Sequence, residues 1–389
     1  MKFAERMSRL GTETAFEILV AARALEAQGR EIVHLEIGEP DFGTPANIVA
    51  AACKGLQEGH THYTPSAGIP ALREAIAEEI SRTRRIPVDP AQVVVTPGGK
   101  PIIFYTILAL AEPGDEVIYP NPGFPIYESM INFAGATPVP LQLREERDFR
   151  FDPDELRDKV SDRTSLIIIN SPHNPTGGIL TRDDLAAIAA IAIERNIPVL
   201  SDEIYCRMVY DGEFQSIASL PGMSVSERTI ILDGFSKTYA MTGWRLGYGV
   251  MPTALAAHVT RFMTNSNSCT AAFIQDAGIE ALKGPQDASY QMVAAFKERR
   301  GVIVDGLNQI PGIRCHMPQG AFYVFPNITG TGMHSKEMEQ FLLHRAGVAT
   351  LSGTSFGKYG EGYIRLSYAN SIANLQKALE RIAKALEDR

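Results

Sequence analysis

Short apolar segments and helix-like segments alternate through the middle of the chain. From about residue 90 onward, each apolar run is broken by Gly, Pro or Asn and followed by residues at helical spacing. Continuous apolar strands that alternate with helices are typical of a mostly parallel sheet covered on both faces. The pattern therefore predicts an α/β domain whose strands lie at 92–96, 115–120, 164–170, 197–202, 229–234 and 246–251, with 183–196 as one intervening helix.

The two ends of the chain follow a different pattern. Residues 12–29 have the spacing of an amphipathic helix, and beyond about residue 287 long helical segments flank the runs GAFYVFPN and YIRLSYAN. These two runs predict strands of a smaller, mixed sheet. We therefore expect a second α/β domain built from both termini. The expected division is an N-terminal arm and part of the small domain at 1–44, a large domain at 45–286, and the remainder of the small domain at 287–389.

Composition and charge narrow the classes of partner. The formal net charge is −8, from 37 basic and 45 acidic residues, so nothing favours binding to nucleic acid or to an anionic membrane. The four cysteines lie too far apart for a metal or redox motif. No stretch reaches the ~18 apolar residues of a membrane span, and the first residues lack the apolar core of a signal peptide. We expect small-molecule partners, no metal and a cytoplasmic location.

Glycines follow the first predicted strand. In an open α/β sheet, ligands bind at the carboxyl ends of the strands, so the residues just after each apolar run are the ones to inspect. After 92–96 comes Pro97-Gly98-Gly99-Lys100, which opens a helix. Glycines here let backbone N–H groups and the helix N-terminus approach an anion, most often a phosphate. A plain turn is the alternative for this segment taken alone.

Other polar side chains follow the later strands. Asn174 stands between two prolines, a restriction that suits an amide held in one direction, although a rigid turn is the alternative. Its neighbour His173 has the setting of a structural side chain rather than a catalyst. Asp202 ends a buried strand and needs a partner for its charge. Lys237 follows 229–234, where partial loss of water favours the neutral amine that forms Schiff bases.

An anion cradle, an oriented amide, a buried carboxylate and a lysine with Arg245 nearby match one cofactor. Pyridoxal phosphate needs an amine for its aldehyde, a carboxylate for its pyridine nitrogen, a donor to its phenolate oxygen and a phosphate site. The chain resembles the class I/II aminotransferases of the fold-type I pyridoxal-phosphate family, and is most similar to the bacterial aspartate aminotransferase group. The matching motifs cover nearly the whole chain: GEPDF, YTPSAGIPALREAIA, PGGK, NPGFPIYE, SPHNPTGG, SDEIY, SKTYAMTGWRLGY and YIRLSYA.

The resemblance implies the roles of the catalytic residues. Lys237 would form the Schiff base with the cofactor and, once released by the substrate, move the proton between the substrate Cα and the cofactor C4′. Asp202 would pair with the pyridine nitrogen, and Asn174 and Tyr205 would donate to the phenolate oxygen. Such an enzyme moves the amino group of an L-amino acid to a 2-oxo acid by a ping-pong mechanism.

The resemblance also implies binding residues. Arg365 would hold the substrate α-carboxylate with a pair of hydrogen bonds, helped by Asn174 and the backbone at Gly38. Tyr63 would reach the phosphate of the neighbouring subunit, so a homodimer is expected. The cofactor phosphate would be held by Gly99, Lys100, Ser236 and Arg245, and Phe124 would stack on the ring.

One position departs from the family pattern. Many relatives carry serine three residues before the lysine as a phosphate ligand, and here that residue is Gly234. A lost hydrogen bond to a charged group is worth about 1.5–3 kcal/mol. We expect weaker phosphate retention rather than loss of the cofactor.

The amino-acid substrate is less strongly determined. Lys100 has a counterpart in the bacterial aspartate group that helps recognise the distal carboxylate, so aspartate with 2-oxoglutarate as acceptor is the first hypothesis. In the alternative, only the backbone of Lys100 matters. Glu13 would pair with Lys100 if the N-terminal helix folds over the site, and would blunt that preference. Alanine, aromatic and prephenate transamination remain open, as does a carbon–sulfur β-lyase on the same fold.

Two functions that do not use pyridoxal-phosphate chemistry, a serine hydrolase and a DNA-binding regulator, do not fit the sequence. Residues 353–357 fit the G-x-S-x-G pattern of serine hydrolases, but no helix pattern follows, and the required histidine after the serine is missing because His344 is the last one. A regulator that joins an aminotransferase-like domain to a DNA-binding helix-turn-helix would need an extra basic domain, and only 37 residues precede Gly38.

Overall fold

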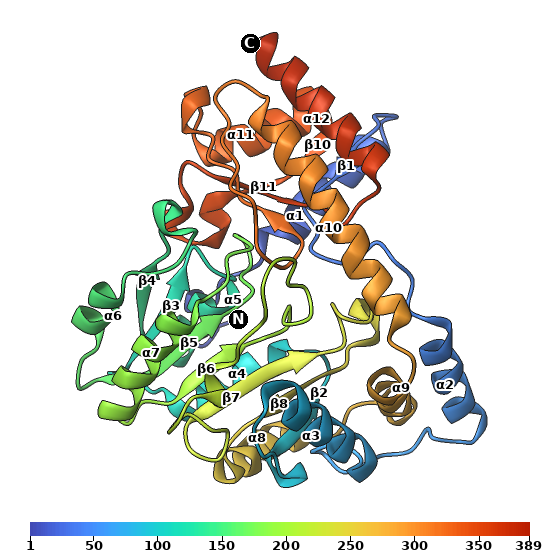
Figure 1. The fold of residues 1–389 in the computed structure, drawn as a ribbon, viewed down its shortest axis with the longest axis vertical. Helices are drawn as coiled ribbons and strands as arrows, with labels where there is room; N and C mark the ends of the chain where they lie inside the picture. The colour runs from blue at the N-terminus through green and yellow to red at the C-terminus, as the bar shows by residue number, and fades with distance from the viewer.

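A seven-stranded sheet forms the middle of the molecule in the computed structural model, which describes all residues from Met1 to Arg389 (Figure 1). Its strand order is β2-β8-β7-β6-β5-β3-β4, and only β8 runs antiparallel to its neighbours. The predicted, mostly parallel sheet is thus confirmed. The strands of the chain are β1 (Val33–His34), β2 (Val93–Thr96), β3 (Glu116–Asn121), β4 (Thr137–Gln142), β5 (Thr164–Asn170), β6 (Val199–Asp202), β7 (Thr229–Gly234), β8 (Gly247–Val250), β9 (Tyr323–Val324), β10 (Val348–Ala349), β11 (Leu351–Ser352) and β12 (Ile364–Ser367).

Apolar side chains leave this sheet on both faces. In β5, Leu166 and Ile168 belong to one apolar cluster, while Ile167 and Ile169 belong to another. Successive strand residues point to opposite faces, so a strand without polar positions must be covered twice. Helix α7 supplies one cover over β5, and α4, α5 and α8 supply the other. None of the helices combines the length and apolar character needed to cross a membrane.

The helices of the chain begin and end as follows. They are α1 (Thr14–Glu26), α2 (Ala46–Gln57), α3 (Pro70–Arg84), α4 (Lys100–Leu110), α5 (Ile126–Ala134), α6 (Pro153–Lys159), α7 (Arg182–Glu194), α8 (Thr253–Ser266), α9 (Ala272–Lys283), α10 (Asp287–Asn308), α11 (Ser335–Phe341) and α12 (Ile372–Glu387).

The two ends of the chain lie side by side. Strand β1, near the N-terminus, pairs in parallel with β10, and a separate three-stranded sheet has the order β11-β12-β9. Helix α10 packs along α12 beside these strands (Figure 1). One apolar cluster joins Val33 and Leu35 to residues from Met292 to Ile382. The smaller unit expected from both termini is therefore present, while its division from the larger one at residues 44 and 287 stays a prediction.

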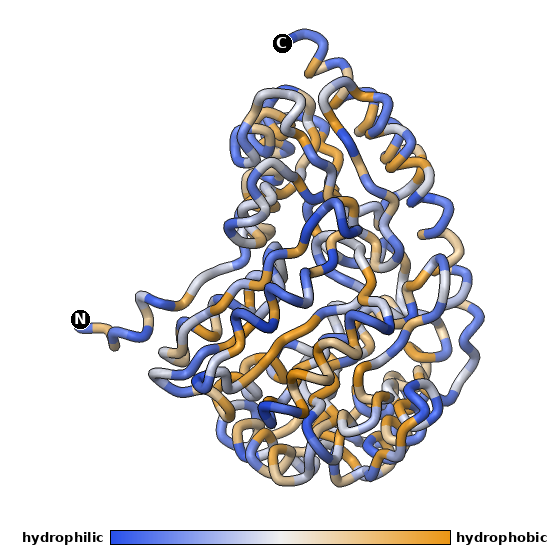
Figure 2. Tube along the Cα trace, turned by 60° about the vertical axis from the view of Figure 1, so that its left-hand side comes forward, coloured by the Kyte–Doolittle hydropathy of each residue, from blue (hydrophilic) through white to orange (hydrophobic).

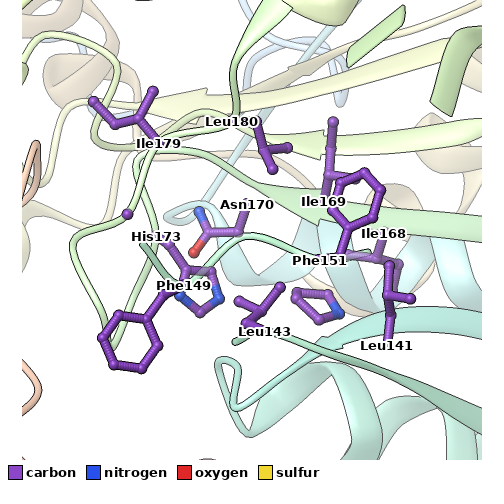
Figure 3. Close-up of a pocket in the computed structure, with 12 residues that line it drawn as sticks. Leu141, Leu143, Phe149, Phe151, Ile168, Ile169, Asn170, His173, Ile179 and Leu180 are labelled. Carbon is purple, nitrogen blue, oxygen red and sulfur yellow. The ribbon is translucent and has the colours of Figure 1, made fainter. Parts of the chain in front are cut away.

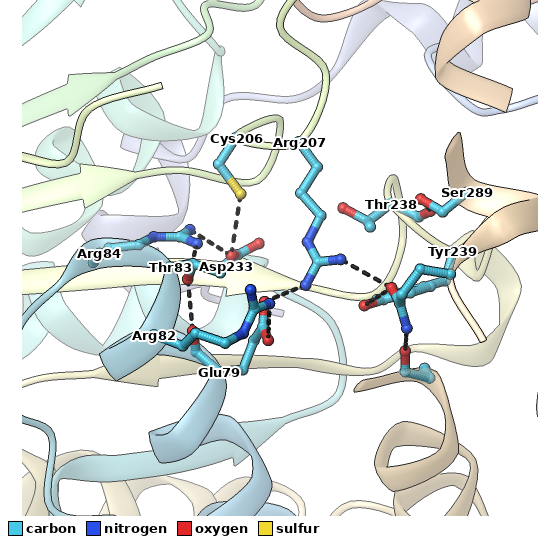
Figure 4. A network of polar contacts seen from close by, with 12 residues as sticks. Glu79, Arg82, Thr83, Arg84, Cys206, Arg207, Asp233, Thr238, Tyr239 and Ser289 are labelled. Atoms are coloured by element: carbon cyan, nitrogen blue, oxygen red, sulfur yellow. Dashed lines mark hydrogen bonds and ion pairs between the residues drawn. The ribbon is translucent and has the colours of Figure 1, made fainter. Parts of the chain in front are cut away.

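A buried ionic network lies at the carboxyl ends of β6 and β7, and Figure 4 shows its Arg84, Asp233 and Cys206 side chains. Arg84, the last residue of α3, donates to Glu203 at 2.9 Å and to Asp233 at 2.8 Å. The side chains of these three residues are between 1% and 7% exposed. Cys206 also contacts Asp233, at 3.4 Å. The network ties helix α3 to the two strands that precede Tyr205 and Lys237.

Candidate active site

The carboxyl ends of the middle strands gather at one edge of the sheet. Asp202 ends β6, Asn174 lies four residues beyond β5, and Lys237 lies three residues beyond β7. Strand β8 is antiparallel to β7, and its first residue Gly247 faces Gly234, the last residue of β7. The antiparallel strand therefore begins where its neighbour ends. This connection returns Arg245 to the edge that carries Lys237.

The Lys237 amine is fixed by a carbonyl and held among aromatic rings. Its Nζ donates to the Gly38 carbonyl oxygen at 2.6 Å, and lies 6.0 Å from the Tyr205 ring centre and 5.8 Å from that of Phe322. Burial lowers the pKa of Lys237 to about 8, and the negative charge of Glu39 opposes this shift. Near neutral pH this amine can therefore exchange a proton more readily than a surface lysine.

The Asp202 carboxylate is buried and accepts two hydrogen bonds. The Tyr127 hydroxyl donates to Oδ2 at 2.7 Å, and the Ile204 backbone N–H donates to Oδ1 at 3.3 Å. Burial raises the pKa of Asp202 to about 6, and the Tyr127 hydrogen bond opposes that rise. The backbone is held as well, since the Asn170 amide donates to the Asp202 carbonyl oxygen at 2.9 Å. Tyr127, which contacts Asp202 here, is not among the residues predicted from the sequence.

Two further contacts join the large sheet to the smaller one. The Tyr205 hydroxyl shares a hydrogen bond of 2.7 Å with the Tyr323 hydroxyl from β9. Arg365 of β12, 4% exposed, donates through Nη1 to the Asn174 side-chain oxygen at 3.4 Å and through Nη2 to the Glu36 carbonyl oxygen. Its Nε is buried without a partner. Arg365 therefore lies beside Asn174, and its Nε–H is left without an acceptor.

Gly38 lies between Lys237 and the segment that contacts Arg365. Its carbonyl oxygen accepts from Lys237, and Glu36, two residues earlier, provides the carbonyl that Arg365 contacts, while the expected help of the Gly38 backbone in binding the substrate carboxylate stays a prediction. A Cβ at Gly38 would lie 2.1 Å from the Tyr323 hydroxyl oxygen. Glycine is therefore needed here because two chain segments approach closely.

Glycines of three segments pack together beneath Arg245. A Cβ at Gly98, whose φ is +85°, would lie 2.2 Å from Arg245 Nη2. A Cβ at Gly247 would lie 2.6 Å from the Gly98 carbonyl carbon, and one at Gly234 would lie 3.0 Å from the Gly247 Cα. The missing serine at Gly234 thus coincides with close backbone packing that leaves little room for any side chain. Ser236 is buried two residues further on.

Lys100 pairs with the N-terminal segment. Its Nζ contacts Glu13 Oε1 and lies 5.6 Å from the centre of the Phe124 ring. The Glu13 side chain is 17% exposed and that of Lys100 is 45% exposed. The expected ion pair is therefore present, and Phe124 lies next to it. Phe124 in turn meets Tyr127 edge to face, which links this pair to the Asp202 side of the site.

Tyr63 is not gathered with these residues in the single chain. Its side chain is 88% exposed, and its hydroxyl makes no hydrogen bond within the chain. It lines a cavity of about 450 Å³ together with His60, Thr61, His62, Cys269, Ala271, Ala272 and Phe273. An exposed tyrosine at an open cavity is free to meet a second molecule.

His173 faces an apolar cavity rather than the other site residues (Figure 3). Its Nδ1 lies 2.9 Å from the Thr176 hydroxyl, and its Nε2 is buried without a partner. Burial lowers the pKa of His173 to about 3, so the ring is neutral. The cavity, of about 20 Å³, is far too small for a substrate. These observations agree with a structural role.

The whole chain resembles proteins of one family. The model of the family "Aminotransferase class I and II" matches residues 30–382. The chain is 43% identical to the aspartate aminotransferase of Pyrococcus horikoshii over 99% of this chain and 97% of that protein. It is 42% identical to aromatic-amino-acid aminotransferase 2 of Thermococcus litoralis, covering 93% and 94% respectively.

A solved structure gives the same result for the fold. The alanine aminotransferase from Pyrococcus furiosus superposes with a TM-score of 0.95 at 36% identity, covering all of both chains. The chain therefore belongs to the class I and II aminotransferases, enzymes that transfer amino groups between amino acids and 2-oxo acids with pyridoxal 5′-phosphate.

Proposed function

We propose that this aminotransferase takes the amino group of L-aspartate, passes it to 2-oxoglutarate, and also accepts neutral amino acids. The observation that carries the proposal is the second cation, Lys100, beside the Phe124 ring. Each dicarboxylic substrate has two carboxylates and is best matched by two cations, here Arg365 and Lys100. The aspartate aminotransferase of Pyrococcus horikoshii supports this choice of donor, and the aromatic and alanine aminotransferases among the relatives support a broader range.

The residues at the sheet edge fit the cofactor by their chemistry. The Gly98 backbone lies where a side chain would collide with the Arg245 guanidinium, so N–H groups and a cation meet in one cradle, as a phosphate requires. The buried Asp202 carboxylate suits a protonated ring nitrogen. When bound, the cofactor supplies an electron sink for the substrate carbon that loses its proton. The residues proposed to hold it are Lys237, Asp202, Asn174, Tyr205, Gly99, Lys100, Phe124, Ser236 and Arg245, with Tyr63 from a second subunit.

Lys237 is proposed to carry the proton in each half-reaction. Its pKa of about 8 lies near physiological pH, where an acid–base group both takes up and releases a proton at low cost. The Gly38 carbonyl orients the amine by accepting a hydrogen bond at 2.6 Å. The rings of Tyr205 and Phe322 cover it and limit access of water. Arg365 orients the substrate by binding its α-carboxylate, for which the unpartnered Nε offers a donor.

The products distinguish transamination of aspartate from the other reactions of this fold. The purified, cofactor-loaded protein should change its visible absorption when L-aspartate is added and should release oxaloacetate in a stoichiometric half-reaction. Release of pyruvate and ammonia from a sulfur amino acid would instead indicate a β-lyase. A spectrum that responds to alanine or to aromatic amino acids but not to aspartate would contradict the proposed donor.

Replacing Lys100 by alanine should raise the KM for aspartate by about 10- to 100-fold and leave the KM for alanine nearly unchanged. A hydrogen bond to a charged group is worth about 1.5–3 kcal/mol, and only the dicarboxylate makes this contact. Steady-state kinetics with both donors would test it. Lys100→Met keeps the aliphatic stem over Phe124 and serves as the control for packing. Equal changes for both donors would remove the side-chain role.

We also propose a homodimer located in the cytoplasm. Tyr63 is exposed and lies at an open cavity in the single chain, as expected for a residue that completes the site of a second subunit. Sedimentation of the cofactor-loaded enzyme should give twice the mass of 42.5 kDa. A fully active monomer would contradict the assembly.

A further inference from the structure

Glu13 occupies the position at Lys100 that the proposed function gives to a substrate carboxylate. It immediately precedes helix α1, and its carboxylate contacts the Lys100 ammonium. A carboxylate already lies where the distal carboxylate of aspartate would have to bind. A second carboxylate at Lys100 would meet the negative charge of Glu13, so the two acceptors would repel each other and compete for the ammonium.

Glu13 also acts on the site through its charge. Burial lowers the pKa values of Lys237 and Arg365 and raises that of Tyr323, and the Glu13 carboxylate partly offsets the first two shifts and adds to the third. Its side chain is only 17% exposed, whereas residues 1–12 are all exposed. Glu13 is thus the first residue of the chain that turns inward, and it turns toward the site.

The segment that precedes Glu13 is lightly attached. The 3-10 helix Glu5–Arg9 contains no buried residue. Two hydrogen bonds join this segment to α5: Arg9 Nε donates to the Asn132 carbonyl oxygen at 3.0 Å, and the Gly11 backbone N–H, beyond the 3-10 helix, donates to the Ser129 hydroxyl at 2.9 Å. Figure 2 shows this segment leading away from the body of the molecule. Moving the Glu13 carboxylate off Lys100 therefore requires no disruption of the core.

We propose that Glu13 is an internal competitor of the substrate's distal carboxylate for Lys100, and that it sets the balance between dicarboxylic and neutral amino acids. With Glu13 on Lys100, the pocket beside Phe124 is electrically neutral, and an alanine or aromatic side chain enters without removing water from an unpaired cation. A dicarboxylate takes the place of Glu13 on Lys100. This inference rests on the proposed function of Lys100.

Glu13→Gln in the cofactor-loaded enzyme should lower the KM for aspartate by about tenfold, because the substrate no longer displaces an anion. The KM for alanine should stay within about twofold of the parent value. Calorimetric titration should give a Kd for maleate, an unreactive dicarboxylate, that is lower by the same factor, and an unchanged Kd for propionate. Glu17→Gln, on the exposed first turn of α1, is the matched control and should change neither ligand.

The double variant Glu13→Gln/Lys100→Met separates the competitor from the proposed function. The tightening caused by Glu13→Gln should vanish when Lys100 is absent, which gives a coupling between the two positions. Unchanged or weaker maleate binding in Glu13→Gln, while Lys100→Met still impairs aspartate more than alanine, would overturn the role of Glu13 and leave the aspartate proposal standing. If Lys100→Met impairs both donors equally, the proposed function fails whatever Glu13 does.

Discussion

Replacing Lys237 by alanine is expected to lower kcat for aspartate by at least about 10²–10⁴-fold, the usual contribution of a positioned acid–base group. The reason is geometric as well as chemical. The amine is oriented by the Gly38 carbonyl at 2.6 Å and lies 6.0 Å from the centre of the Tyr205 ring. Single-turnover measurements of the absorbance change with aspartate would determine the loss.

A small primary amine provides the control for the Lys237→Ala variant. If Lys237 acts as the proton carrier, added methylamine should restore part of the lost rate in proportion to its unprotonated fraction, which increases with pH. An unchanged circular dichroism spectrum would show that the fold is intact. Retention of more than about a tenth of the parent kcat would contradict the assignment, because another group would then be moving the proton.

Replacing Arg84 by methionine is expected to lower the free energy of unfolding by about 3–5 kcal/mol. Arg84 is the shared cation of Glu203 and Asp233, and its removal leaves two buried carboxylates without their cation. Urea unfolding would give the difference. Arg82→Met is the matched control on the same helix, since the Arg82 side chain is 70% exposed and its ion pair with Glu79 is worth about 0–1 kcal/mol.

The pH dependence tests whether charge causes the loss in Arg84→Met. Burial raises the pKa of Glu203, and Arg84 opposes that rise, so the pKa must climb further when Arg84 is removed. A carboxyl group whose folded-state pKa is raised contributes stability at low pH that is lost as the pH rises through that pKa. The deficit of the variant should therefore be smaller at pH 5 than at pH 8. Equal deficits at the two pH values would indicate lost packing instead.

The strands of the middle sheet could be predicted because an apolar run between turn residues allows few other structures. Strands β5 and β7 begin and end at the expected residues, 164–170 and 229–234. Strand β4 could not be predicted in this way. Its sequence TPVPLQ contains two prolines and is mostly half-exposed. Proline removes a ladder donor, which is tolerated at the edge of a sheet, where β4 lies.

Only those site residues that lie at or just beyond the ends of strands could be predicted from the sequence. Asn174, Asp202 and Lys237 follow parallel strands, whose carboxyl ends meet at one edge whatever the details of packing. Tyr127 and Tyr323 have no such marker. They reach Asp202 and Tyr205 across 75 and 118 residues of sequence, from a helix and from the smaller sheet. Hydrophobic periodicity contains no information about which side chains meet over such separations.

The reversed direction of β8 also bears on how firmly the cofactor is retained. Because β8 returns to the edge that β7 has just left, only a short loop separates Lys237 from Arg245. In their proposed roles, Lys237 and Arg245 hold the two ends of the cofactor. When one of these contacts opens, the other keeps the cofactor at an effective concentration of about millimolar, so the open contact re-forms before the cofactor dissociates. In those proposed roles, slow dissociation of the cofactor would follow from its being held at two ends as well as from the strength of each contact.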